Sequence, residues 1–143
     1  MDRSANYLGI ARKAGFLEIG EESAGLAVRH GTAKLLVLAA DASDNARRRA
    51  EGYVFGTHVP LVTAVQTKQE LSRLWSKPGC SMAAITDVGI AAGYADALAE
   101  AQLEQYADVA ALLAEKNRRA AQRRTEKRAA DHNKRVGKRR NNT

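Results

Sequence analysis

Asp41 and Asp87 are the residues of this sequence whose positions most resemble those of catalytic or metal-binding groups. Each follows an apolar run, KLLVLAA before Asp41 and SMAAIT before Asp87, and such runs are typical of buried strands. If both strands end at the same edge of a parallel sheet, the two carboxylates could bind Mg²⁺ or perform acid–base chemistry. Alternatively, each carboxylate caps a helix or turn by accepting backbone N–H groups. Capping is favoured, because no Lys, His or third acid stands at a fixed offset from either residue.

The other residue types suited to chemistry form no recognisable pattern. His30, His58 and His132 lack the spacing of metal ligands. Cys80 has no neighbouring His, and Lys77 could lower its pKa only modestly, so a buried or bystander thiol is favoured. The sequence contains neither G-x-G-x-x-G after a strand nor G-x-x-x-x-G-K-[ST]. We therefore expect no catalytic residue, metal or cofactor.

The positive charge of the chain is concentrated at its C-terminal end. Residues 115–143 contain 12 Lys or Arg and 3 acids, whereas residues 1–114 contain 11 basic and 13 acidic side chains. A helix here would present cations along one side, because their spacing is three or four residues. The segment has no aromatic residue for base stacking, so we expect it to bind phosphate without reading sequence. The alternative is a solubilising charge run. The predicted contacts are Arg119, Arg123, Arg124 and Lys127.

Helical and strand-like patterns alternate along the chain. Helical patterns cover residues 6–15, 20–31, 67–75 and 88 to about 128, and a further helix starts at residue 43 or 44 and runs through the arginines at 47–49. Apolar runs cover 16–20, 34–40, 58–65 and 81–86. The alternation predicts one three-layer α/β/α sandwich with a four-stranded, mostly parallel sheet, plus a long C-terminal helix and basic tail. We expect a domain over residues 1–105 and a basic helical extension over 106–143, whose docking weakens between residues 105 and 114. The N-terminus has no apolar run suited to a signal peptide or membrane span. The single cysteine excludes an internal disulfide. Both observations lead us to expect a cytoplasmic protein.

Four blocks of sequence occur in a recognisable order: NYLGIARKAGFLEIGEES, GTAKLLVLAADASDN, HVPLVTAVQTKQELSRL and AAITDVGIA. Together, over about residues 5–98, they resemble the ribosomal L7Ae/L30e family, in the form of its short bacterial YlxQ-type branch. The resemblance implies a compact α/β/α fold without catalytic residues. It also implies binding of RNA, typically kink-turns, in ribosomal and other ribonucleoprotein particles. The expected partner is thus ribosomal or other structured RNA, with the ribosome as a candidate, no membrane, and a monomeric protein.

The resemblance also implies which residues face RNA, all along one edge of the sandwich. They lie in the loop entering the second helix, in the motif after KLLVLAA, at the start of the fourth helix and in a variable loop before the last strand: Gly20, Glu21, Glu22, Ser23, Ser43, Arg47, Lys68, Lys77, Pro78 and Gly79. After KLLVLAA, the resemblance favours Ser43 and Arg47 over Asp41 as RNA contacts, with Asp41 shaping the loop.

The residues that read kink-turns in the family differ here. The family pattern has Asn-Glu followed three residues later by Lys, whereas this sequence has Glu22, Ser23 and Leu26. Two further hypotheses stay open. The edge could bind a protein of the translation machinery, with the tail only localising the chain. A third, weaker hypothesis is a hydrolase using Asp41 and Asp87.

Overall fold

The structure is a computed structural model that describes residues 3–141, with side chains through Val136. Helices and strands alternate along these residues, as the sequence predicts. The elements are α1 (Arg3–Ala14), β1 (Leu17–Ile19), α2 (Glu21–Arg29), β2 (Leu35–Leu38), α3 (Asp44–Val54), β3 (Leu61–Thr63), α4 (Lys68–Trp75), β4 (Met82–Ile85), α5 (Val88–Ala101) and α6 (Leu103–Asn141).

The four strands form a mixed sheet in the order β1-β4-β2-β3. Only β2 and β3 pair in parallel, and β4 is antiparallel to both of its neighbours, β1 and β2. The prediction of a mostly parallel sheet is therefore wrong. The cause is the connection before β4. Helix α4 begins where β3 ends, and residues 76–81 bring the chain back to that same end of the sheet before β4 starts.

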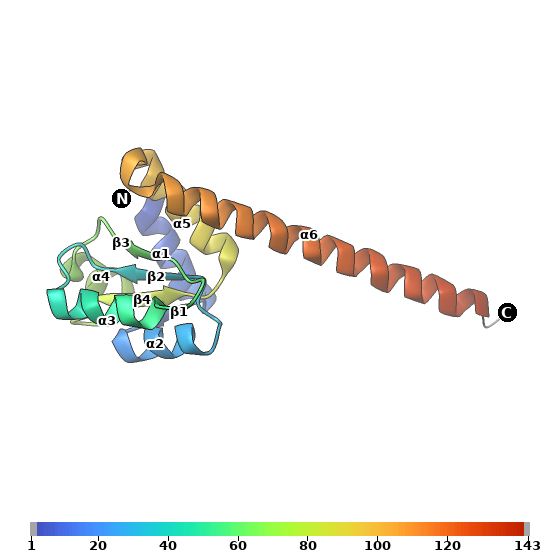
Figure 1. Cartoon of the computed structure of the whole chain (residues 1–143), viewed down its shortest axis with the longest axis horizontal. Helices are drawn as coiled ribbons and strands as arrows, with labels where there is room; N and C mark the ends of the chain where they lie inside the picture. Colours follow the sequence, from blue (N-terminus) through green and yellow to red (C-terminus); the bar gives the residue numbers. More distant parts are fainter. Residues whose placement is uncertain (1–2, 142–143) are drawn as a thin grey trace.

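Helices cover both faces of the sheet (Figure 1). Leu35 and Val37 of β2 belong to a core cluster that includes side chains of α1, α4, α5 and α6. Leu36 and Leu38 point to the other face, into a cluster with α2 and α3. All four residues of β2 are fully buried, which confirms that KLLVLAA contains a strand covered on both faces. The three-layer α/β/α arrangement is thus as predicted.

The predicted single helix over residues 88–128 is instead two helices, α5 and α6. Gln102, at φ −141° and ψ 77°, ends α5, and the chain folds back so that Asn117 lies beside Gly89 at the start of α5. The reversal buries Leu113 completely, whereas a straight helix would leave that side chain in solvent. Tertiary packing therefore overrides a local sequence that favours one uninterrupted helix.

Helix α6 docks on the body through residues 103–117. The Tyr106 hydroxyl donates a 2.6 Å hydrogen bond to the Thr63 carbonyl, and burial raises the pKa of this phenol. Leu113 belongs to the main core cluster, whereas every residue from 121 to 135 is exposed. The exposed part of α6 extends away from the body (Figure 1). Although α6 spans 39 residues, neither it nor any other described helix is apolar enough to cross a bilayer.

Leu113→Ala will lower the free energy of unfolding by about 2 to 5 kcal/mol, because it leaves a cavity between α6 and the core. Leu112→Ala is the matched control, since Leu112 is 45% exposed; its effect will stay below about 1 kcal/mol. Urea unfolding of the full chain measures both values. Equally small effects would show that α6 does not share the core of the body.

Candidate nucleic-acid interface

The mixed sheet brings four connections to one end. Because β1 and β2 are both antiparallel to β4, they run in the same direction, and β3 runs parallel to β2. The carboxyl ends of β1, β2 and β3 therefore lie beside the amino end of β4. We call this region the loop end of the sheet; it comprises residues 20–23, 39–47, 64–68 and 76–81. All the residues expected at RNA, apart from the tail cations, lie here.

Backbone hydrogen bonds tie these connections together. Gly20 donates its N–H to the Met82 carbonyl at 2.9 Å, and Ala39 donates to the Ser81 carbonyl at 2.8 Å. Gly20 also has φ +100°, a conformation that side-chain-bearing residues rarely adopt. Backbone hydrogen bonds thus join the first and second loops of the predicted site to the start of β4 and the residue before it.

Asp41 caps a helix that is distant in sequence. Its Oδ1 accepts a 2.8 Å hydrogen bond from the Lys68 backbone N–H at the start of α4. Thr67 and Glu70 complete the same helix start, since each side chain accepts a hydrogen bond from the other's backbone N–H. The favoured prediction that Asp41 is a turn and cap residue is confirmed. Its partner, 27 residues away, joins the second and third loops of the loop end.

Asp87 lies at the other end of the sheet. Its Oδ2 accepts a 2.9 Å hydrogen bond from Ile90 N–H and caps α5. Because β2 and β4 are antiparallel, Asp41 and Asp87 are separated by at least the length of these short strands, roughly 10 Å. The expectation that both carboxylates could share one edge is wrong, which removes the basis for a hydrolase. Among the described residues, no group of three or more His, Cys, Asp or Glu could hold a metal ion.

Ser43 and Arg47 lie where the second loop becomes α3. The Ser43 hydroxyl accepts a 3.1 Å hydrogen bond from Ala46 N–H and caps the helix. One terminal nitrogen of Arg47 donates a 3.1 Å bond to Thr63 Oγ1 at the end of β3, and the side chain is half-buried. Arg47 therefore holds its charge at the loop end, in a position set by β3.

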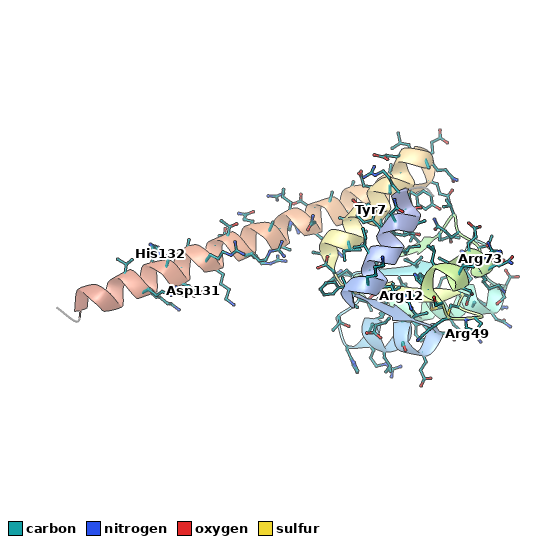
Figure 2. The ribbon with its side chains drawn as sticks, turned by 180° about the vertical axis from the view of Figure 1, so that it is seen from behind. Tyr7, Arg12, Arg49, Arg73, Asp131 and His132 are labelled. Atoms are coloured by element: carbon teal, nitrogen blue, oxygen red, sulfur yellow. The ribbon has the colours of Figure 1, made fainter. Side chains whose placement is uncertain are left out.

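The three residues that open α2 differ in what they offer a ligand. Glu21 forms a 2.5 Å ion pair with Arg49 of α3, a residue labelled in Figure 2, and also accepts a 3.5 Å hydrogen bond from the Tyr53 hydroxyl. Its carboxylate is thus committed to the α2–α3 contact. Glu22 is exposed and Ser23 is half-buried, so these two remain accessible at the loop end.

The loop between α4 and β4 exposes three residues and buries the fourth. Lys77, Pro78 and Gly79 are exposed, whereas Cys80 is buried. Burial raises the pKa of the Cys80 thiol, and the nearby Lys77 only partly opposes that shift. The thiol is therefore protonated at neutral pH, which agrees with the bystander role predicted from the sequence.

The buried side-chain amide of Gln66 connects the loop end to two core helices. Gln66, only 3% exposed, donates a 2.8 Å hydrogen bond from Nε2 to Ser4 of α1, and its Oε1 accepts one from the Tyr94 hydroxyl of α5 at 3.4 Å. The Gln66 carbonyl accepts a 2.8 Å bond from Ala40 N–H. These contacts link two core helices to two loops of the site. Sequence reasoning missed them, because a lone Gln after a strand has no distinctive pattern.

The tail cations do not join the loop end. Arg119, Arg123 and Arg124 line a cleft at the opposite end of the sheet, and Lys127 lies further along α6, exposed to solvent. Figure 2 labels Asp131 and His132 still further out on the same helix. The expected RNA contacts thus fall into two separate groups.

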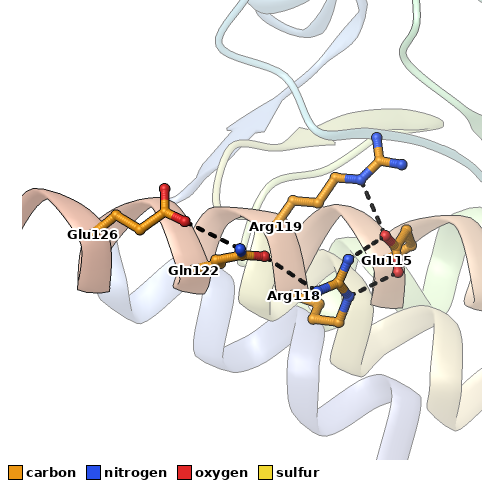
Figure 3. A network of polar contacts seen from close by, with 5 residues as sticks. All are labelled: Glu115, Arg118, Arg119, Gln122 and Glu126. Atoms are coloured by element: carbon orange, nitrogen blue, oxygen red, sulfur yellow. Dashed lines mark hydrogen bonds and ion pairs between the residues drawn. The ribbon is translucent and has the colours of Figure 1, made fainter.

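Glu115 organises the first cations of α6 (Figure 3). It accepts two hydrogen bonds from Arg118, at 2.7 and 3.0 Å, and one from Nε of Arg119 at 3.0 Å. The hydrogen bonds from Arg118, followed by the one from Arg119, lower the pKa of Glu115 to about 2. Gln122 continues the chain of contacts from Arg118 to Glu126. Glu115 therefore stays ionised and neutralises part of the charge of Arg118 and Arg119.

Comparison with known proteins decides the family. A model of the ribosomal protein L7Ae/L30e/S12e/Gadd45 family matches residues 2–93. The chain belongs to this family. The resemblance noted from the four sequence blocks is thereby confirmed. The match ends within α5, so the basic helix α6 lies outside the matched part of this L7Ae-family chain.

Solved structures share the fold. A protein of unknown function from Bacillus halodurans is 25% identical, with a TM-score of 0.62 and coverage of 67% of this chain and 96% of its own. A 15.5 kD RNA-binding protein from Giardia lamblia is 21% identical, with a TM-score of 0.54 and coverage of 67% and 82%. The second similarity shows the fold alone. No curated protein sequence matches the chain.

Asp41→Ala will lower the free energy of unfolding by about 0.5 to 2 kcal/mol, because the first N–H of α4 loses its acceptor. Asp41→Asn will cost less, since the amide oxygen can still accept that hydrogen bond. Thermal or urea unfolding monitored by circular dichroism measures both. If Ala and Asn have the same negligible effect, Asp41 does not cap α4.

Proposed function

We propose that this L7Ae-family protein is a noncatalytic, cytoplasmic and monomeric RNA-binding protein that acts on ribosomal or other structured RNA. The observation that carries the proposal is the loop end itself, where four connections are held in one surface by hydrogen bonds to the backbone. A surface of this kind suits the shape of a folded RNA, because its loops need little ordering on binding.

The electrostatics of the loop end suit phosphate groups. Helices α2, α3 and α4 all begin there, and the positive ends of their dipoles face the same side. Two of the acids at this end, Glu21 and Asp41, are occupied by Arg49 and by the start of α4. Arg47 and Lys68 add positive charge beside those helix starts. The combination favours a polyanion despite the acids in the sequence.

The exposed part of α6 supplies attraction without sequence recognition. Basic side chains that neutralise phosphates release counterions. For a duplex, the logarithm of the binding constant therefore falls by about 0.9 per phosphate contact for each tenfold rise in salt concentration. In this proposal the loop end provides shape recognition and α6 provides electrostatic affinity. Arg119, Arg123, Arg124 and Lys127 are the proposed phosphate contacts on α6.

Kink-turns are a weaker proposal than structured RNA in general. Glu22 stands exposed where the family has an amide, and Leu26, 42% exposed, stands where it has a Lys. A carboxylate beside a phosphate without a neutralising Lys disfavours that contact by about 1 kcal/mol or more.

The exposed pair Glu22 and Leu26 also supports a second candidate, an adaptor that binds a protein of the translation machinery. In that case an apolar side chain flanked by an acid contacts the partner, and α6 localises the chain to the ribosome. A protein partner that is lost on Leu26→Lys, together with absence of RNA binding, would select this candidate.

The full chain will bind a structured RNA in gel shifts, with affinity falling steeply as salt rises. Lys68→Glu will weaken binding by about tenfold, because it places a negative charge at the loop end. The backbone N–H of residue 68 still reaches Asp41, so the fold is kept. Lys13→Glu, at the exposed end of α1 and away from the loop end, is the control and will have little effect. Absence of binding at low salt would refute the proposal.

The triple substitution Glu22→Asn, Ser23→Glu and Leu26→Lys will strengthen kink-turn binding by about tenfold or more, because it restores the family's contact residues and adds a cation. All three side chains are at least partly accessible, so the fold should tolerate the change. Fluorescence anisotropy with a kink-turn and with a matched straight duplex separates specific from general binding. An equal gain for both RNAs would show that only charge has changed.

A further inference from the structure

A cleft of about 760 Å³ lies at the end of the sheet opposite the loop end. Its lining includes Lys34 before β2, Val59 before β3 and Thr86 after β4, and α6 forms one wall from Lys116 to Arg124. The cleft therefore exists only because α6 folds back across this end of the sheet. None of the residues implied by the family resemblance lines it.

The cleft is strongly positive. Its lining has five Lys or Arg residues and a single acid, Asp87. Asp87 is occupied in capping α5, where it accepts a hydrogen bond from Ile90 N–H. Four of these five side chains are exposed, so their gathering around one cleft, and not burial, concentrates the charge. The basic residues are Lys34, Lys116, Arg119, Arg123 and Arg124.

Most of this charge is not neutralised within the protein. Lys116 donates a 2.7 Å hydrogen bond to the His58 carbonyl, an uncharged group that leaves two donors of the ammonium for a ligand. Arg119 uses Nε for Glu115, an acid it shares with Arg118. Arg123 lies one turn beyond Arg119, about 6 Å along the helix axis. Among the described side chains, Arg123 and Arg124 make no ion pair.

An exposed aromatic residue stands two positions before the cleft lining in the sequence. Phe55 directly follows α3 and is 86% exposed, the highest value among the large apolar side chains of the described part, and Thr57 and His58 just after it line the cleft. A compact turn fixes the backbone here. Thr57 Oγ1 donates to the Val54 carbonyl at 2.7 Å and accepts from Val59 N–H at 3.1 Å. Aromatic side chains and cations together are the combination that binds bases and phosphates of single strands.

We propose that this cleft is a second RNA site, which takes a single-stranded segment. Arg119, Arg123 and Lys34 contact successive phosphates, and Phe55 stacks on a base. A duplex fits less well, because its bases are already stacked and offer no free face to the ring. The inference rests on the proposed RNA binding, but it adds a separate site on the far end of the sheet. One protein then holds a folded RNA at the loop end and an unpaired strand at the cleft.

The test uses an oligouridylate of about 12 nucleotides, which has no folded structure for the loop end to recognise. The double variant Arg119→Ala and Arg123→Ala will bind it about tenfold more weakly. The log–log salt slope will fall by about 1.4, or about 0.7 for each lost contact. Fluorescence anisotropy of the labelled oligonucleotide at several salt concentrations measures both quantities.

The matched control is the double variant Lys134→Ala and Arg135→Ala. It removes the same charge from exposed positions of α6 that do not line the cleft. It will weaken binding by less than about threefold, because charges that do not line the cleft act only through general attraction.

Phe55 supplies an independent readout. Phe55→Ala will weaken oligouridylate binding by about fivefold or more while leaving the salt slope unchanged, because stacking releases no counterions. Phe55→Tyr keeps the aromatic face and will bind like the original chain. Leu103→Ala removes another exposed apolar side chain, 67% exposed, from the start of α6 and serves as the control.

The outcomes separate this inference from the proposed function. If the cleft pair and the control pair weaken oligouridylate binding equally, the cleft is not a site. If Lys68→Glu weakens structured RNA while no cleft variant affects oligouridylate, RNA binding at the loop end stands and the second site is refuted. Oligouridylate binding that depends on Arg119, Arg123 and Phe55 supports the cleft even if structured RNA fails to bind. If the cleft variants bind oligouridylate normally but no longer cross-link to a protein in cell extract, the cleft binds a protein and the proposal is overturned.

Discussion

The antiparallel pairing of β4 between β1 and β2 is the constraint on which the rest of the structure depends. It places the start of β4 beside the ends of the other three strands, and so gathers four connections at the loop end. The same pairing carries the end of β4 to the far side, where α5 begins and α6 returns. With a parallel β4, the loop over residues 76–81 would leave the loop end and Asp87 would join it. Strand direction alone thus decides which residues can act together.

The loop end is built mainly from backbone and capping contacts. The N–H groups of Gly20, Ala39 and Ala40 and the Asp41 carboxylate determine where the connections lie. Side chains such as Glu22 and Lys77 project from a surface whose shape they do not determine. Substitutions at those positions can therefore change what the surface offers to a partner without changing the fold.

The sequence was most informative where the physics is local. The apolar run KLLVLAA predicted a strand buried on both faces, and Thr67 predicted a helix start, because both depend on neighbouring residues. The sequence also favoured a capping role for Asp41. It could not predict which helix Asp41 caps, because Lys68 comes within reach only in the folded chain. The direction of β4 and the reversal at Gln102 were missed for the same reason: each is decided by apolar surface that is buried only when distant elements pack.

The distribution of charge follows from that packing. As a sequence, residues 115–143 are a uniform basic segment, but in the folded chain the cations have different surroundings. Arg118 and Arg119 share Glu115, whereas Arg123 and Arg124 lie against the cleft and Lys127 lies in open solvent. Equal formal charges therefore differ in which groups they can reach together. Because α6 lies outside the family match, one wall of the cleft is built from residues beyond the matched part of the chain, whereas the loop end lies wholly within it.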